Sequence, residues 1–187
     1  MQPLPKNAAL IVIDIQNGFD DPYWGNRNNL QAEQNVARLL DAWRRSKRPV
    51  LYARHDSKNP KSPLYPGQKG NEIKEIVQPI SGEPVIPKSV NSAFIGTDLE
   101  ERLRKDKIDS VVITGITTNH CVSTTARMAG NLGFETYVVS DATATFDIKG
   151  PDGRHYSADE MHAMGLAEIH NEFATVLDTE TLLKNLD

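Results

Sequence analysis

Short apolar runs recur along the chain and are separated by more polar segments. The first covers residues 8–14 (AALIVID), and the others lie at 49–53, 84–86, 110–114, 136–140 and 173–177. A short, continuous apolar run is typical of a strand that is buried on both faces, as in a parallel sheet. The pattern therefore predicts six buried strands.

The segments between these runs have a different period. Between the first two runs, apolar side chains recur at the i, i+3, i+4, i+7 spacing of an amphipathic helix: Val36, Leu39, Leu40 and Trp43. A weaker stripe lies in residues 97–107, and a face of small residues follows Cys121. Strands that alternate with helices predict an α/β fold. We expect a single domain over residues 1–187, with a doubly wound, six-stranded parallel sheet and helices on both faces.

Two segments lack either period. Residues 56–70 and 147–156 are rich in Pro, Gly and polar side chains. Such composition is typical of loops. We expect both to be loops that cover a functional site.

Composition narrows the class of partner. The 187 residues include 21 Lys and Arg and 25 Asp and Glu, a net charge of −4, with the two signs interspersed. No basic run predicts a nucleic-acid or membrane surface, and no apolar run approaches the roughly 18 residues of a membrane span. We expect a soluble cytoplasmic protein that binds a small molecule, with no nucleic-acid or membrane partner.

Three chemically capable residues follow predicted strands. Asp14 ends the first run, Lys88 follows the third and Cys121 follows the fourth. Ligands of doubly wound sheets bind at the carboxyl ends of the strands, so the three side chains are expected to converge. A thiol in the first turn of a helix and near a lysine is expected to have a lowered pKa. A nearby carboxylate is suited to general acid and base catalysis, and free backbone N–H groups to holding an oxyanion. Together they predict acyl transfer with a cysteine nucleophile.

Each of these residues also has a structural interpretation. A lone Cys after a strand is commonly packed core, and a strand-terminal Asp commonly caps a loop. A further alternative is a non-catalytic binding or redox-sensing protein in which Cys121 is oxidised to a sulfenic acid. The residues alone leave these alternatives open.

The motifs in order resemble those of the isochorismatase-like cysteine hydrolases, a superfamily that includes nicotinamidases and N-carbamoylsarcosine amidohydrolase. The resemblance covers nearly the whole chain. It rests on the segments 13–19 (IDIQNGF), 87–88 (PK), 91–94 (NSAF), 114–122 (TGITTNHCV), 126–127 (AR), 133–134 (GF) and 140–142 (SDA).

The resemblance implies a role for each member of the trio. Asp14 is expected to be the general base and acid, Lys88 the stabilising cation and Cys121 the nucleophile. It also implies a cis peptide bond between Ile116 and Thr117, with the N–H groups of Thr117 and Cys121 as the oxyanion hole. Relatives of this kind are usually homodimers or homotetramers, and we expect the same here.

Departures from family patterns guide the choice of subfamily. Isochorismatases that hydrolyse a vinyl ether typically lack the cysteine, so Cys121 favours cleavage of a C–N bond through a thioester. The vinyl-ether hydrolase, using Asp14 without covalent catalysis, is the alternative. Nicotinamidases carry a metal site with a D-x-H pattern after the second strand, and residues 54–57 read RHDS instead. We therefore expect no metal and no cofactor.

Four further residues are candidate substrate contacts. Phe19 and Trp24 follow the first strand and could wall a small pocket, with surface packing as the alternative for Trp24. Arg54 and His55 end the second strand. Arg54 is predicted to meet a substrate oxygen or to pair with an acid, and His55 to contact substrate or to belong to a hydrogen-bonded loop.

Overall fold

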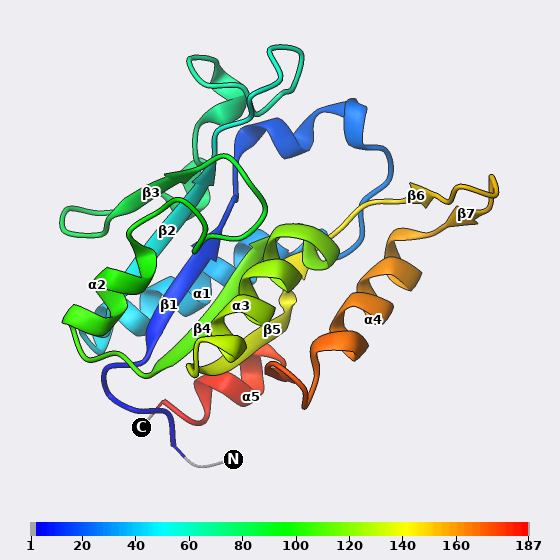
Figure 1. Ribbon diagram of the computed structural model, residues 1–187. Helices are drawn as coiled ribbons and strands as arrows, with labels where there is room; N and C mark the ends of the chain where they lie inside the picture. Colours follow the sequence, from blue (N-terminus) through cyan, green and yellow to red (C-terminus); the bar gives the residue numbers. More distant parts are fainter. Residues whose placement is uncertain (1–2, 187) are drawn as a thin grey trace.

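A parallel six-stranded sheet forms the centre of the protein (Figure 1). The computed structural model describes residues 3–186. The strand order is β3-β2-β1-β4-β5-β8, and all six predicted strands are confirmed. Their bounds are β1 Ala9–Ile13, β2 Val50–His55, β3 Val85–Lys88, β4 Ser110–Ile116, β5 Glu135–Ala144 and β8 Thr175–Leu177.

Register within the sheet brings the strand ends together. Ile13 of β1 pairs with Ala53 of β2 on one side and with Gly115 of β4 on the other. At the next pair of strands, His55 of β2 lies beside Lys88 of β3. The carboxyl ends of β3, β2, β1 and β4 therefore lie at one edge of the sheet, as a doubly wound fold requires of its ligand site.

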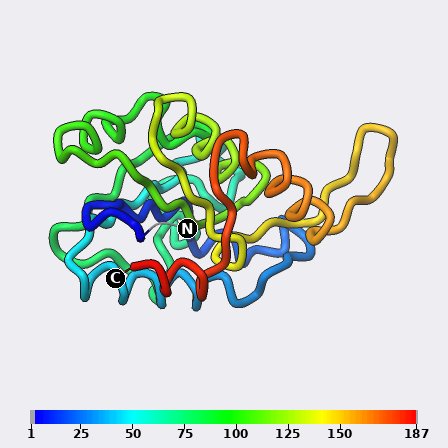
Figure 2. Tube along the Cα trace, turned by 90° about the horizontal axis from the view of Figure 1, so that it is seen from below, coloured from blue at the N-terminus to red at the C-terminus, as the bar shows by residue number. Residues whose placement is uncertain are grey.

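Helices cover both faces of the sheet, as predicted. The five α-helices of residues 3–186 are α1 Ala32–Arg45, α2 Leu99–Lys105, α3 Ser123–Asn131, α4 Ala158–Ile169 and α5 Thr179–Leu183. Side chains of α1 and α5 share one buried cluster with Leu10 and Val12, whereas those of α2, α3 and α4 share another with Ile11 and Ile13. Figure 2 shows the resulting three layers from below. Because both faces of β1 are covered, its sequence is continuously apolar.

The segment 147–156 differs from its prediction. It forms a short antiparallel hairpin of β6 (Ile148–Lys149) and β7 (His155–Tyr156) that projects from the body of the protein (Figures 1 and 2). The backbone N–H of Gly150 donates to the carbonyl of Arg154 across its turn at 2.8 Å. It is not a loop over the strand ends.

Helix α4 was not apparent as a periodic stripe. Its exposed positions include Ala163, Met164 and Ala167, so apolar side chains face both the core and solvent. Its start does carry a local signal, because Ser157 and Glu160 form a reciprocal capping box. None of the helices in residues 3–186 combines the length and apolarity needed to cross a membrane.

Candidate active site

Cys121 is held in an unusual turn at the end of β4. All seven residues of this strand are buried, and the peptide bond between Ile116 and Thr117 is cis. Residues Thr118–Val122 then form a π-helical turn, in which the N–H of Val122 donates to the carbonyl of Thr117 at 3.1 Å, before α3 begins. The thiol of Cys121 therefore lies at the carboxyl edge of the sheet, two residues before the regular helix begins.

Gly115 permits the close approach of β4 to β1 at this point. Its φ is 131°, and a Cβ atom there would lie 2.0 Å from the carbonyl oxygen of Ile13. Only glycine meets both conditions without moving the backbone. This glycine sets the β4 turn beside Asp14, which directly follows Ile13.

Asp14 and Lys88 form an ion pair that is fully buried. The Nζ atom of Lys88 lies 2.6 Å from Oδ2 of Asp14, and both side chains have 0% exposure. Burial raises the pKa of Asp14, and the charge of Lys88 opposes that rise. The Oδ1 atom of Asp14 is buried and has no hydrogen-bond partner among the described residues. Lys88 thus holds Asp14 through Oδ2, and within the described residues Oδ1 stays available to accept a hydrogen bond or a proton.

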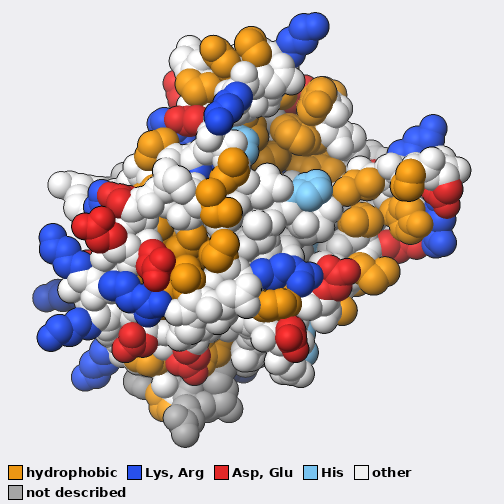
Figure 3. Space-filling model, in the orientation of Figure 1, with side chains coloured by type: hydrophobic (Ala, Val, Ile, Leu, Met, Phe, Trp, Pro, Cys, Tyr) orange, Lys and Arg blue, Asp and Glu red, His pale blue; other side chains and the backbone are white. Residues whose placement is uncertain are grey.

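A cavity of about 280 Å³ opens beside these groups. Its lining combines the predicted acid and thiol with aromatic, amide and imidazole side chains: Asp14, Phe19, Trp24, His55, Leu64, Asn91, Thr117, His120 and Cys121. Lys88 lies behind this surface, in contact with Asp14 and His55. In Figure 3 hydrophobic and histidine side chains gather around the hollow above the strand ends. The volume suits a small molecule.

Aromatic rings form one wall of the cavity. The ring centroids of Phe19 and Trp24 are 5.0 Å apart, and Phe146 lies 6.0 Å from Phe19. The indole N–H of Trp24 donates to the carbonyl of Gly18 at 2.8 Å, which fixes the ring. Leu64 adds to the lining from the segment 56–70, the other predicted loop. That segment, unlike 147–156, does reach the cavity.

Arg54 does not line the cavity. Its guanidinium instead makes two hydrogen bonds to the carboxylate of Asp56, at 2.8 and 3.0 Å. Successive side chains of a strand point to opposite faces, so Arg54 and its neighbour His55 cannot both face the cavity. Of the two roles expected for Arg54, the structure shows the pairing with an acid, and contact with substrate stays a prediction.

Three lining residues had no assigned role: Leu64, Asn91 and His120. The Oδ1 atom of Asn91 lies 3.8 Å from Sγ of Cys121. Asn91 stands in the NSAF motif and His120 precedes the cysteine, so both carried a sequence signal. Leu64 carried none, because only the path of a long loop places it here.

The pKa of Cys121 differs from its expectation. Burial raises the pKa of the thiol, and the negative charge of Asp14 adds to the rise. With an exposure of 8%, the thiolate would lose solvation that the charge of Lys88 only partly replaces. The pKa of the thiol is therefore raised, and the predicted lowering is wrong.

The same atoms do not fit a metal site. Ligand atoms of Asp14, His55 and Cys121 lie within 4.8 Å of one another. The ammonium of Lys88, however, contacts Asp14 at 2.6 Å and Nδ1 of His55 at 3.2 Å. A metal ion bound there would face this positive charge at close range and compete with it for the same acceptors.

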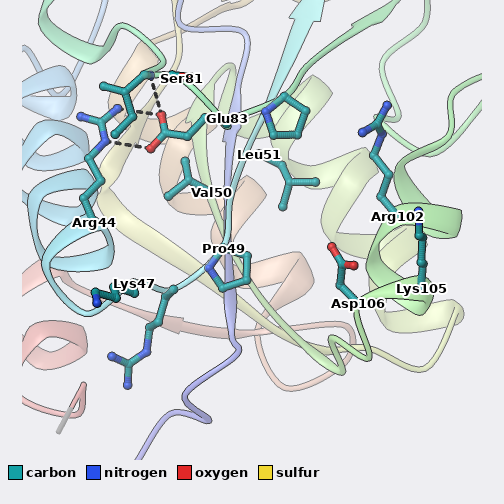
Figure 4. A pocket seen from close by; sticks show the side chains of 14 residues that line it. Arg44, Lys47, Pro49, Val50, Leu51, Ser81, Glu83, Arg102, Lys105 and Asp106 are labelled. Atoms are coloured by element: carbon teal, nitrogen blue, oxygen red, sulfur yellow. Dashed lines mark hydrogen bonds and ion pairs between the residues drawn. The ribbon is translucent and has the colours of Figure 1, made fainter.

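A larger cavity at the opposite edge of the sheet has different chemistry (Figure 4). It measures about 740 Å³ and lies between α1 and α2, and neither Cys nor His is among its described lining residues. Arg44 on one wall binds Glu83 at 2.8 Å, while Arg102 and Lys105 stand on the other. Volume therefore does not identify the reactive site, whereas the buried acid and thiol do.

Known proteins resemble this chain over its whole length. The Isochorismatase domain model matches residues 8–181. YrdC of Bacillus subtilis, an isochorismatase family protein, is 49% identical over 182 residues, which are 97% of each chain. Nicotinamidase 3 of Arabidopsis thaliana is 33% identical over 197 aligned positions, covering 98% of this chain and 91% of its own.

A solved structure extends the likeness to three dimensions. An isochorismatase-family protein from Chromobacterium violaceum superimposes with a TM-score of 0.95 at 45% identity, covering 100% of this chain and 98% of its own. The sequence motifs, the fold and these relatives agree. The chain belongs to the isochorismatase family of hydrolases.

Proposed function

We propose that this hydrolase is a metal-independent cysteine amidohydrolase. It cleaves a C–N bond of a small amide, ureido or carbamoyl compound through a thioester on Cys121. The observation that carries the proposal is the meeting of a thiol and an orphan carboxylate oxygen in one small cavity, with Lys88 fixing that carboxylate at 2.6 Å.

The first half of the reaction forms the thioester. As Sγ of Cys121 attacks the carbonyl carbon, the thiol proton passes to Asp14, whose Oδ1 has no other partner. Burial raises the pKa of Asp14, which makes this carboxylate a better acceptor for the thiol proton. Asp14 then returns the proton to the nitrogen as the C–N bond breaks, and ammonia or an amine leaves.

The second half regenerates the enzyme. Asp14 takes a proton from water, the resulting hydroxide attacks the thioester carbon, and the C–S bond breaks. The sulfur recovers the proton from Asp14, and the carboxylic acid product leaves. Lys88 compensates the charge of Asp14 whenever that carboxylate is ionised.

Backbone amides can hold the oxyanion in both halves. No described residue accepts a backbone hydrogen bond from the N–H of Thr117, and Thr117 lines the cavity beside Cys121. The N–H groups of Thr117 and Cys121 are the donors that we assign to the oxyanion. Such a donor contributes most where water is excluded, as in this buried turn.

The relatives support C–N cleavage. One of them is a nicotinamidase by name, and nicotinamide is a small amide. A vinyl-ether hydrolase remains the rival within the family, and it predicts turnover of isochorismate that survives loss of the thiol. The covalent reaction is supported instead by the thiol of Cys121, which lines the same cavity as Asp14 within 4.8 Å of its carboxylate.

The test is a screen for ammonia release over small amides, ureido acids and carbamoyl compounds. The wild type is compared with Cys121→Ala, and Cys121→Ser keeps a hydroxyl in nearly the same volume. We expect both variants to lose at least about 10³-fold in turnover on any substrate found. A Cys121→Ala variant that matches the wild type would contradict the proposal.

A further inference from the structure

Lys88 fixes the ring tautomer of His55. An ammonium group has three N–H donors and no acceptor. Lys88 directs them to Oδ2 of Asp14 at 2.6 Å, to the carbonyl of Val90 at 3.1 Å and to Nδ1 of His55 at 3.2 Å. The Nδ1 atom of His55 must therefore accept, and the ring proton is on Nε2.

The imidazole is also kept neutral. Burial lowers the pKa of His55, and the charge of Lys88 lowers it further. The backbone of His55 is held on both sides, because its N–H donates to Oε1 of Gln16 at 2.9 Å and its carbonyl accepts from Nδ2 of Asn71 at 3.0 Å. His55 is thus a positioned ring with a single, defined donor.

The donor of His55 has no partner among the described residues. None of the hydrogen bonds within residues 3–186 uses Nε2 of His55, although the ring lines the cavity. One of the two ring nitrogens lies within 4.8 Å of both Sγ of Cys121 and a carboxylate oxygen of Asp14. The imidazole as a whole is therefore close to the carbon that the sulfur would attack, and its Nε2–H belongs to a ring that lines the same cavity.

We infer that Nε2–H of His55 donates a hydrogen bond to an acceptor oxygen of the substrate. This inference rests on the proposed function and narrows its substrate class. A carbon bound to sulfur lies about 1.8 Å from it, and a hydrogen bond spans about 2.9 Å. Since the oxygen of the attacked carbonyl is assigned to the oxyanion hole, the acceptor that reaches His55 is a second oxygen near the attacked carbon, two bonds away as in an α-carboxylate.

Two substitutions separate the two ring nitrogens. His55→Asn places an amide oxygen near the position of Nδ1, so it keeps an acceptor for Lys88 and loses the donor to substrate. His55→Gln places an amide N–H near the position of Nε2, so it keeps the donor and loses the acceptor. A role in binding substrate and a role in supporting Lys88 therefore predict opposite outcomes.

The probes are two aldehydes that form a hemithioacetal with Cys121. The thiol adds across the aldehyde C=O bond, so that sulfur binds carbon and the proton ends on oxygen. Glyoxylate carries an acceptor oxygen two bonds from the attacked carbon, and propanal carries a methylene and a methyl group there. Protection of Cys121 from alkylation by iodoacetamide measures the affinity of each aldehyde, and thermal unfolding shows that each variant is folded.

We expect His55→Asn to bind glyoxylate about tenfold more weakly than the wild type, the effect of one hydrogen bond. His55→Gln should stay near the wild type, and propanal should bind all three proteins alike. Equal glyoxylate affinity in His55→Asn and the wild type would overturn the inference. A larger loss of glyoxylate affinity in His55→Gln would also overturn it, because His55 would then be a positioning residue for Lys88. A wild-type thiol that iodoacetamide alkylates, and that neither aldehyde protects, would overturn it as well. Failure of the proposed function shows separately, as turnover by Cys121→Ala.

Discussion

Two buried lysine–carboxylate pairs in this protein have opposite properties. Lys74 lies 2.8 Å from Glu33, and Lys88 lies 2.6 Å from Asp14. Burial favours the neutral acid in both. At Glu33 the hydrogen bonds from Arg27 and Lys74 outweigh burial and lower the pKa to about 2, whereas at Asp14 burial outweighs Lys88 and raises the pKa.

The difference lies in how the carboxylate oxygens are used. Oε1 of Glu33 accepts from Arg27 at 2.6 Å and from Lys74 at 2.8 Å, and Oε2 accepts from Arg27 at 2.5 Å. Asp14 leaves Oδ1 unpaired. A carboxylate whose oxygens are all bound stabilises the fold, whereas one with a free oxygen beside a thiol is available to take a proton.

The largest expected effect follows substitution of Asp14. Asp14→Asn keeps the shape and an acceptor for Lys88 but removes the base, so turnover should fall by at least about 10³-fold. Initial rates of ammonia release measure it, with Glu33→Gln as the matched acid-to-amide control. A loss of turnover of less than tenfold in Asp14→Asn would show that Asp14 is not the general base.

Substitution of Glu33 should affect stability and not chemistry. Glu33→Gln should lower the free energy of unfolding by about 3 kcal/mol near neutral pH, because a pKa shift is a difference in stability between charged and neutral forms. Urea unfolding measures this, and turnover should stay within about twofold. A tenfold loss of turnover with an unchanged free energy of unfolding would show that Glu33 serves catalysis and not stability.

The contribution of Glu33 should depend on pH in one direction. Its pKa of about 2 in the folded protein lies below the ordinary value of 4.5, so the stability it adds is present above about 4.5 and is lost as pH falls toward 2. Urea midpoints of the wild type and Glu33→Gln should therefore converge on acidification. A difference between the two midpoints that grows below pH 4.5 would show that the pKa of Glu33 is not lowered in the folded protein.

The cavity wall should have a smaller effect. Trp24→Ala removes part of the apolar lining and should raise KM about tenfold with little change in kcat. Tyr65→Ala is the control, because Tyr65 is also aromatic but is exposed and outside the lining. Steady-state kinetics distinguish the two, and equal KM values would show that Trp24 does not contact substrate.

Arg54 should have the smallest effect. Arg54→Gln breaks the pair with Asp56 outside the cavity and should change kcat/KM by less than about twofold. Kinetics at low ionic strength would expose any hidden role. A KM increase of tenfold or more in Arg54→Gln would show that Arg54 contacts substrate.

The fold was predictable where local pattern and burial agree. Continuous apolar runs identify the six strands, because a parallel sheet covered on both faces buries nearly every position of its central strands, all of them in β1 and β4. Helix α4 was not predicted, because Ala and Met at its exposed positions hide the difference between its buried and exposed faces. The hairpin at residues 147–156 escaped because a turn-rich composition does not show whether a segment folds back over a site or away from it.

The site was predictable as far as strand order determines it. Asp14, Lys88 and Cys121 lie at the carboxyl ends of β1, β3 and β4, and parallel strands end at the same edge of a sheet, so topology alone brings them together. Side-chain direction at Arg54 and solvation at Cys121 depend on register and packing, which one sequence does not specify. For that reason the sequence left the two roles of Arg54 open, and the lowered pKa of the thiol was wrong.

The most direct test of the central claim is intact-protein mass spectrometry of enzyme quenched in acid during turnover. The wild type should gain the mass of the substrate's acyl group, peptide mapping should place it on Cys121, and Cys121→Ala should show neither adduct nor turnover. Turnover by Cys121→Ala at the wild-type rate, with no adduct on either protein, would contradict a thioester on Cys121.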